Sequence, residues 1–380
     1  MPLLPEVRRI AVLRANGIGD LIFALPALAA LRSAYPSAHI TLLAAPWHKE
    51  LLAGREEPAD DVLVVPAAAG IRKGPGEDED DEASARFLSR MRARRFDLAL
   101  QMHGGGRYSN PFVSRLGARS TAGLQAAGVP GLDLNVPYVY YQSEVLRLLE
   151  VAALVGAEPV TLEPRLAVTE SDLAEANAVL PSDGAPLAVL NPGASDPRRR
   201  WPPEKFAAVG DALRTAGATV AIVGGPNDRE LGRAVASAMR GPACDLTGRI
   251  GLGGLAGLLS RSRLLVSNDT GPLHLGAAVG APTVGIYWCG NLINAGPAYR
   301  RRHRPQVSWR LDCPVCGIDC TRSVCSHDAS FVADVPEDQV IAAGLDLLAA
   351  GAADNQQPAG SPGGHAATSA RPVGSVQPKQ

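Results

Sequence analysis

The sequence predicts an α/β protein built from two doubly wound halves, each with a parallel sheet. Short apolar runs alternate with helical patterns along the chain, which is typical of βαβ units. The alternation restarts at Leu187, after a connection from about residue 158 to 186 that is rich in Pro, Glu and Ala. Glycine-rich loops follow predicted strands in both halves, so we expect a ligand-binding cleft between the halves.

The individual elements are predicted from the length and periodicity of each apolar run. In the first half we expect strands at residues 10–13, 39–44, 61–65 and 96–101 and a helix at 20–34. In the second half we expect strands at residues 187–190, 218–223, 264–266 and 282–287, helices at 203–216 and 254–260, and another helix that ends at Met239.

Two segments fall outside this pattern. Residues 77–82 are six consecutive acidic residues, which repel one another and indicate a solvated loop. Residues 352–380 are dominated by Pro, Gly, Ser, Ala and Gln, so we expect a disordered tail.

The composition excludes several classes of protein. The chain has 380 residues, 46% of them hydrophobic, and can bury the cores of two or three domains. A formal charge of −1, from 37 basic and 38 acidic side chains, argues against nucleic acid as a partner. The longest uncharged apolar stretch, residues 21–31, is shorter than the roughly 20 residues that span a bilayer. With no recognisable signal peptide, the chain is predicted to be cytoplasmic.

The most informative motif is Asn-Asp-Thr-Gly-Pro-Leu-His at residues 268–274, which follows an apolar strand and opens a helix of small residues. The first turn of a helix offers unpaired N–H groups and the positive end of the helix dipole. Gly271 allows a ligand to approach the backbone, and Pro272 has no N–H to leave unpaired. The motif therefore indicates a binding site for the phosphate groups of a nucleotide-bearing ligand. The alternative is an ordinary turn that caps the helix.

Six motifs follow one another along the chain. They are RANGIGD at 14–20, LPAL at 25–28, NPGA at 191–194, KF at 205–206, GGP at 224–226 and NDTGPLH at 268–274. Together they resemble the motifs of glycosyltransferase family 9, the lipopolysaccharide heptosyltransferase family, over about residues 8–348. The resemblance implies a GT-B fold, in which two Rossmann-like domains with parallel sheets face each other across a cleft. Residues 1–170 would bind the acceptor and residues 180–350 the nucleotide-sugar donor.

The resemblance also implies the reaction. It is the inverting, metal-independent transfer of a heptose-like sugar from a nucleotide diphosphate donor, with ADP-heptose expected, to a saccharide hydroxyl. The acceptor would be a lipopolysaccharide-core-like or other cell-envelope glycan, and catalysis would need no cofactor. A glycolipid acceptor would bring the protein to the inner face of the cytoplasmic membrane as a peripheral protein. Two alternatives remain: a non-catalytic nucleotide-sugar-binding protein, and a nucleotide-sugar epimerase of the same fold.

Asp20 is the candidate general base. It stands at the start of the first helix, where the helix dipole favours an ionised carboxylate. Gly17 and Gly19 beside it leave room for an acceptor, and similarity to the family assigns Asp20 the base role. The alternative is that Asp20 only caps the helix.

Arg199 is the candidate clamp for the departing diphosphate. The resemblance matches it to a position where heptosyltransferases commonly have a lysine, and a guanidinium keeps that charge while offering two donors. The alternative is a solvated basic turn. The resemblance also implies that Glu230 lies near the nucleoside ribose. The alternative is that Glu230 is an ordinary exposed residue of a helix. The implied donor site contains Asn191, Gly193, Glu230, Asp269, Thr270, Gly271, Pro272 and His274.

A cysteine cluster is the one motif that this chemistry does not use. Cys313, Cys316, Cys320 and Cys325 lie within thirteen residues, with His327 nearby. Four thiols this close can surround one tetrahedral zinc ion. The spacing matches no standard zinc-finger or iron–sulfur pattern, so a structural zinc site and free or paired structural thiols both remain open.

Overall fold

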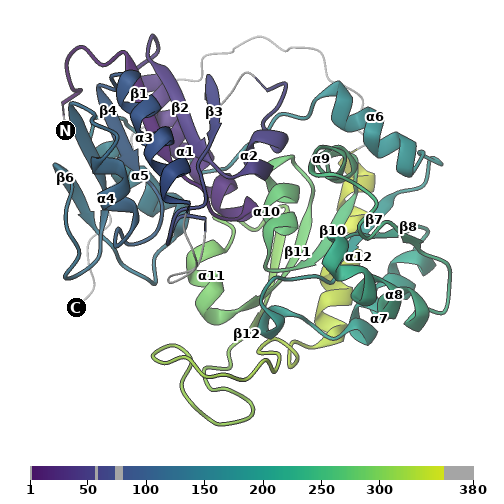
Figure 1. Ribbon diagram of the computed structural model, residues 1–380. Helices are drawn as coiled ribbons and strands as arrows, with labels where there is room; N and C mark the ends of the chain where they lie inside the picture. Colours follow the sequence, from purple (N-terminus) through teal and green to yellow (C-terminus); the bar gives the residue numbers. More distant parts are fainter. Residues whose placement is uncertain (1, 56–58, 73–79, 355–380) are drawn as a thin grey trace, which may run out of the picture.

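The computed structural model describes residues 2–55, 59–72 and 80–354. These residues form two sheets of six parallel strands, one in each half of the chain, with helices packed against them (Figure 1). The predicted fold class, two Rossmann-like α/β domains, is confirmed.

The first half has the strand order β3-β2-β1-β4-β5-β6. Its strands are β1 (Arg9–Leu13), β2 (His39–Ala44), β3 (Asp61–Val64), β4 (Leu98–Gln101), β5 (Ser120–Gln125) and β6 (Leu134–Pro137). Its helices are α1 (Ile18–Ala34), α2 (Pro46–Leu51), α3 (Asp81–Ala93), α4 (Ser109–Ser114) and α5 (Glu144–Ala153). In β1 the residues from Ile10 onward are buried, as expected for a central strand covered on both faces.

The second half has the strand order β12-β11-β10-β7-β8-β9. Its strands are β7 (Leu187–Asn191), β8 (Thr219–Ile222), β9 (Cys244–Asp245), β10 (Leu264–Asn268), β11 (Thr283–Trp288) and β12 (His303–Ser308). Its helices are α6 (Glu170–Val179), α7 (Pro203–Thr215), α8 (Arg229–Ala238), α9 (Leu252–Ser260), α10 (Gly271–Ala278), α11 (Cys289–Ala295) and α12 (Glu337–Asp354). A short 3₁₀ turn, Pro197–Arg199, follows β7.

Sequence patterns do not predict the strands β5, β6, β9 and β12. The edge strands β6 and β12 are largely half-buried, and β12 carries polar residues and a proline, so neither has a continuous apolar run. An edge strand pairs on one side only and tolerates such residues.

The expectation of a loop over the whole acidic run 77–82 is wrong for its last residues. Asp81 and Glu82 open α3, where carboxylates are favourable at the helix N-terminus, and Asp80 accepts a hydrogen bond from the N–H of Ala83 at 2.8 Å. Residues 77–79 lie outside the described residues. In the predicted tail, residues 352–354 continue α12, and 355–380 also lie outside the described residues.

The two halves share one apolar core. Helices α1 and α10 pack against each other between the sheets, and α6 packs against α9. Buried Leu25 and Leu28 of α1 belong to the same hydrophobic cluster as Leu273 and Leu275 of α10. This packing fixes how the loops at the carboxyl ends of the sheets meet. Among the described residues, no helix combines the length and apolar character that a membrane span requires.

Candidate active site

The first turns of α1 and α10 meet where the two halves join. A Cβ atom added to Gly19 would lie 2.9 Å from Cδ2 of His274, and one added to Gly271 would lie 3.1 Å from Cβ of Ile18. These distances leave little or no space for a side chain, so the close approach of the helices favours glycine at both positions. The sequence predicts that Gly17 and Gly19 leave room for the acceptor. For Gly19 the structure gives a further reason for glycine, which is the close packing of α1 against α10.

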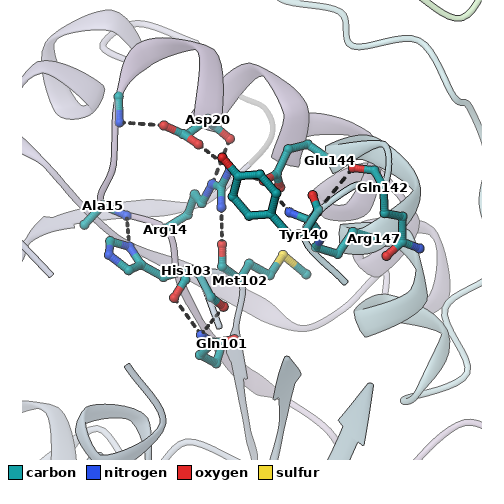
Figure 2. A network of polar contacts seen from close by, with 12 residues as sticks. Arg14, Ala15, Asp20, Gln101, Met102, His103, Tyr140, Gln142, Glu144 and Arg147 are labelled. Atoms are coloured by element: carbon teal, nitrogen blue, oxygen red, sulfur yellow. Dashed lines mark hydrogen bonds and ion pairs between the residues drawn. The ribbon is translucent and has the colours of Figure 1, made fainter. Parts of the chain in front are cut away.

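Asp20 lies in the first turn of α1, and both of its carboxylate oxygens are hydrogen-bonded (Figure 2). Oδ1 accepts a hydrogen bond from Arg14 at 2.8 Å, and Oδ2 accepts one from the N–H of Gly17 at 3.0 Å. The side chain nevertheless keeps 37% exposure. Helix capping, the alternative role for Asp20, is therefore present together with an accessible carboxylate.

Arg14 is the buried cation that orients Asp20. Its side chain is 2% exposed, and it also donates to the backbone carbonyls of Asp20 at 2.8 Å and Met102 at 2.5 Å. Glu144 lies 3.7 Å from the same guanidinium and accepts a hydrogen bond from Arg147 at 2.5 Å (Figure 2). A buried charge needs such partners, so this network holds the Asp20 carboxylate in one place.

Two buried histidines, His48 and His103, interact electrostatically with the Arg14–Asp20 pair. Nδ1 of each ring accepts a hydrogen bond from a backbone N–H, at 3.3 Å for His48 and 3.2 Å for His103. A ring nitrogen that accepts carries no proton, so each ring is neutral with its proton on Nε2. Burial, followed by the nearby charge of Arg14, lowers the pKa of both rings to about 4. At neutral pH these histidines add no charge beside Asp20.

Asp269 precedes α10, and its carboxylate is turned into the protein. Oδ1 lies 3.0 Å from Nε2 of His274, Oδ2 accepts a hydrogen bond from Asn291 at 2.7 Å, and Arg199 lies 3.5 Å from Oδ2. Burial opposes the charge, but the hydrogen bond and charge of His274, followed by the charge of Arg199, lower the pKa of the Asp269 carboxyl. The carboxylate thus organises this site by holding His274, Asn291 and Arg199.

Arg199 lies in the 3₁₀ turn beside the start of α10. Its Nη1 donates to the carbonyl of Asp269 at 3.2 Å, and its Nη2 donates to Ser195 at 3.1 Å. Its Nε is buried and has no hydrogen-bond partner among the described residues. The neighbouring Arg198 is instead ion-paired with Asp196 at 2.7 Å. Arg199 is therefore the arginine of this turn that lies against Asp269 beside the start of α10, and its side chain keeps 28% exposure.

Thr270, Gly271 and Pro272 form the half-buried start of α10. Thr270 is the N-cap residue, but its side chain makes no capping hydrogen bond to the described backbone. The first N–H groups of α10 and the Thr270 hydroxyl are therefore suited to an anionic ligand, as the motif predicts.

Asn191 and Gly193 have hydrogen-bonding and packing roles in this structure, and their assignment to the donor site stays a prediction. Asn191 is 1% exposed and donates to Ser267 at 3.0 Å. A Cβ atom added to Gly193 would lie 2.5 Å from Cγ of Asp228. Glu230 is exposed in the first turn of α8, and its proposed contact with a ribose stays a prediction.

A cavity of about 1700 Å³ lies between the two halves. It is lined by α1, α10, the connection at residues 160–170 and the segment after α11. His274 borders this cavity, whereas Asp20, Arg199 and Thr270 do not. The candidate reacting groups do not open into this cavity, so it is not the expected ligand cleft at the carboxyl ends of the strands, and that cleft stays a prediction.

Comparison with known proteins identifies the family. The profile of "Glycosyltransferase family 9 (heptosyltransferase)" matches residues 84–305, which is more than half of the chain. The chain belongs to glycosyltransferase family 9. It is therefore an enzyme that transfers glycosyl groups.

Named relatives and solved structures agree with this membership. The lipooligosaccharide heptosyltransferase 2 of Haemophilus influenzae is 25% identical over 295 residues, which cover 73% of this chain and 82% of the relative. The family 9 glycosyltransferase of Veillonella parvula superimposes with a TM-score of 0.76 at 22% identity, covering 92% of this chain and all of that one. The E. coli ADP-heptose lps heptosyltransferase II superimposes with a TM-score of 0.71 at 20% identity, covering 90% and 99%. The two superpositions show the shared GT-B fold.

Three of the four predicted cysteines of this family 9 glycosyltransferase lie close together in the structure, and His327 takes the place of the fourth. The ligand atoms of Cys313, Cys316, Cys325 and His327 all lie within 4.8 Å of one another. Cys320 is not part of this group, and its Sγ lies 3.4 Å from the carbonyl of Ile318. The backbone N–H of Cys316 is the main cause that lowers the pKa of the Cys313 thiol to about 6.

Sequence analysis of this glycosyltransferase misses three residues that shape the site. Arg14 is part of the first motif, and its position at the end of a buried strand is the only sequence signal for a role. Glu144 and Asn291 lie in no motif, and they reach the site only because the fold brings α5 to β1 and α11 to α10.

Proposed function

We propose that this enzyme transfers a heptose-like sugar from ADP-heptose to a saccharide hydroxyl of a lipopolysaccharide-core-like acceptor, with inversion and without a metal ion. The observation that carries the proposal is the contact between the first turns of α1 and α10 at Gly19. It brings the helix that holds an accessible carboxylate against the helix whose start is suited to a diphosphate. The names of the relatives, lipooligosaccharide heptosyltransferase and ADP-heptose lps heptosyltransferase, support the same donor and acceptor class.

The residues divide the chemistry between them. The Asp20 carboxylate removes the proton of the acceptor hydroxyl while that oxygen forms a bond to the anomeric carbon. The bond between the anomeric carbon and the diphosphate breaks, and its electron pair leaves with the nucleotide diphosphate. Arg199 and the first N–H groups of α10 stabilise that departing charge. A single displacement of this kind inverts the anomeric carbon and needs no cofactor.

A glycolipid acceptor implies contact with a membrane surface, so we place the enzyme on the cytoplasmic face of the inner membrane as a peripheral protein. The absence of a spanning helix among the described residues is compatible with this placement. Sedimentation of the protein with vesicles of zwitterionic lipid, with and without anionic lipid, measures the contact directly; no sedimentation with either would contradict it.

Nucleotide binding and product analysis test the proposed function. ADP-heptose and ADP should raise the melting temperature more than UDP-sugars do, because a ligand that binds the folded state stabilises it. Incubation with ADP-heptose and a core acceptor should release ADP and give a glycosylated acceptor. Interconversion of the sugar without an acceptor would indicate an epimerase instead, and binding without any product would indicate a sensor.

A further inference from the structure

The cysteine-rich segment between β12 and α12 forms a long loop, residues 309–331, which we call the Cys–His loop. It projects from the second half and is drawn in yellow-green at the bottom of Figure 1. Its described residues contain no helix or strand beyond one isolated bridge between Asp312 and Asp319. Phe331, at the end of the loop, is buried in the core of the second half, but the other large apolar side chains are exposed, with Val315 60% and Val324 86% exposed. Apolar packing therefore does not account for the order of a loop this long, which needs a cross-link of another kind.

Four side chains of this loop bring their ligand atoms close enough together to surround one metal ion. Cys313, Cys316, Cys325 and His327 present their ligand atoms within 4.8 Å of one another. Sγ of Cys313 lies 3.7 Å from Nδ1 of His327. Zinc–sulfur and zinc–nitrogen bonds of about 2.3 and 2.0 Å at a tetrahedral angle would separate these two atoms by roughly 3.5 Å.

The backbone around Cys313 supports the arrangement. The N–H of Cys313 donates to the carbonyl of Ile318, and the N–H of Gly317 donates to the carbonyl of Cys313, both at 2.9 Å. Gly317 has a φ of +71°, which favours glycine. The tight turn directs Cys313 and Cys316 toward the same point. The N–H groups of Cys316 and Val315 point at Sγ of Cys313, the kind of outer contact that orients a metal-bound sulfur.

The same loop supports the arginine turn next to α10. Ser330 donates from its hydroxyl to the carbonyl of Arg200 at 2.6 Å, and the N–H of Phe331 donates to the carbonyl of Arg198 at 2.7 Å. The guanidinium of Arg198 lies 5.6 Å from the centre of the Phe331 ring. Arg199, between these two anchored residues, is thereby held beside Asp269. The loop also reaches the first half, because the hydroxyl of Tyr141 donates to the carbonyl of Thr321 at 3.0 Å.

We propose that Cys313, Cys316, Cys325 and His327 bind one tetrahedral metal ion of the zinc type, and that this ion holds the Cys–His loop against the arginine turn. The ion takes no part in the transfer chemistry; it is a structural support for the position of Arg199. The consequence for the donor rests on the proposed function, whereas metal binding and loop order do not depend on it.

Metal content and a cobalt titration test the ligand set. The full-length protein, purified without chelators, should contain about one equivalent of zinc or iron by elemental analysis. After metal removal, added Co²⁺ should give the thiolate-to-cobalt charge-transfer absorption of a cysteine-rich tetrahedral site, and Zn²⁺ should displace it. If the wild-type protein contains no bound metal and shows no such absorption with Co²⁺, the proposal is overturned, and no variant is needed to decide this.

Matched variants separate the proposed ligands from the cysteine that lies outside the group. His327→Ala and Cys316→Ser should each weaken Co²⁺ binding at least tenfold or abolish it, while Cys320→Ser should bind as the wild type does. Loss of binding in Cys320→Ser together with full binding in His327→Ala would refute this ligand set in favour of four cysteines.

Amide hydrogen exchange tests the connection to the arginine turn without any nucleotide. Removal of the metal from the wild-type protein should raise exchange at least several-fold in peptides that cover residues 195–201 and 311–331. Peptides from α3, on the first half, provide the control. Faster exchange in the loop alone, with unchanged exchange in 195–201, would show that the metal does not hold the turn. Failure of ADP to bind would count against the proposed function only, since this experiment uses no nucleotide.

Discussion

The buried guanidinium of Arg14 donates to Oδ1 of Asp20 at 2.8 Å and lies 3.7 Å from Glu144, so one cation serves two carboxylates. Among the described residues Asp20 is ion-paired with Arg14 alone, whereas Glu144 is also paired with the buried Arg147. The Met102 carbonyl also accepts a hydrogen bond from Arg14. Arg14 thus links the end of β1 to α1, β4 and α5 around the candidate base. Removal of Arg14 should therefore lower the free energy of unfolding more than removal of Asp20 does.

Arg14→Met should lower the free energy of unfolding by about 3–5 kcal/mol, because it leaves the Asp20 carboxylate without its cation and the buried Met102 carbonyl without its donor. Urea denaturation measures the change. The exposed Arg119→Met in the same half is the matched control and should cost much less. Equal effects of Arg14→Met and Arg119→Met would mean that the network contributes little.

Asp20→Asn should keep the fold and the affinity for ADP while it reduces turnover by about 10²–10⁴, the range expected when a general base is lost. The amide oxygen can replace one of the two accepting oxygens, so one of the hydrogen bonds from Arg14 and Gly17 is kept and the fold should survive the loss of the other. Steady-state transfer and ADP calorimetry measure the two quantities. The exposed Glu50→Gln on α2 makes the same chemical change elsewhere in this half and should leave turnover unchanged. Wild-type turnover in Asp20→Asn would exclude the base role.

Gly19→Ala should lower the free energy of unfolding by about 1–3 kcal/mol, because the added Cβ would lie 2.9 Å from the His274 ring. It should also reduce turnover, since the first turns of α1 and α10 would be pushed apart. Gly17→Ala is the comparison, because its added Cβ would meet only Oδ2 of Asp20, at 3.2 Å. Thermal unfolding and transfer assays on both variants decide the point; a harmless Gly19→Ala would show that the helices need not touch.

The sequence predicts the two-sheet fold because each central strand is a continuous apolar run followed by a glycine-rich turn. Three of the four strands that it misses, β6, β9 and β12, lie at sheet edges, and β12 carries polar residues and a proline. The candidate base and the start of α10 are also predictable, since a helix N-terminus after a buried strand has a recognisable local sequence.

The contacts that give these residues their roles are not local, and sequence patterns cannot predict them. Arg14 meets Met102 and Glu144 only after β1 pairs with β4 and α5 packs beside α1. In the same way, the inward orientation of the Asp269 carboxylate depends on Asn291 from α11. Sequence analysis therefore identifies the residue types at the site and leaves their partners to the structure.

Arg199→Met should weaken ADP binding about 10- to 100-fold, the loss expected for a charge-assisted hydrogen bond to a diphosphate. Arg199→Lys should retain part of the affinity, because it keeps the charge but not the two-donor geometry. Calorimetry at low and high salt measures both effects, and the exposed Arg233→Met on α8 is the control. Unchanged ADP affinity in Arg199→Met would remove this arginine from the donor site and leave the role of Asp20 unaffected.

The buried histidines predict a specific loss of stability in acid. Burial, with the charge of Arg14, lowers the pKa of His48 and His103 to about 4 in the folded protein, whereas an unfolded chain has histidine pKa values near 6.5. Between about pH 6.5 and 4 the unfolded chain therefore binds protons that the folded protein does not. The free energy of unfolding should be complete above this window and fall as the pH drops through it, by up to about 3 kcal/mol for each ring.

Urea denaturation at a series of pH values measures this slope, and glutamine substitutions assign it. His48→Gln and His103→Gln should each lower stability at pH 7, because the buried ring and its backbone hydrogen bonds are lost, yet each should flatten the fall between pH 6.5 and 4. The double variant should be flatter than either single one, since both rings titrate in the same window. A slope that stays as steep in the double variant would mean that other groups, such as buried His303, whose pKa is also lowered to about 4, cause the acid sensitivity.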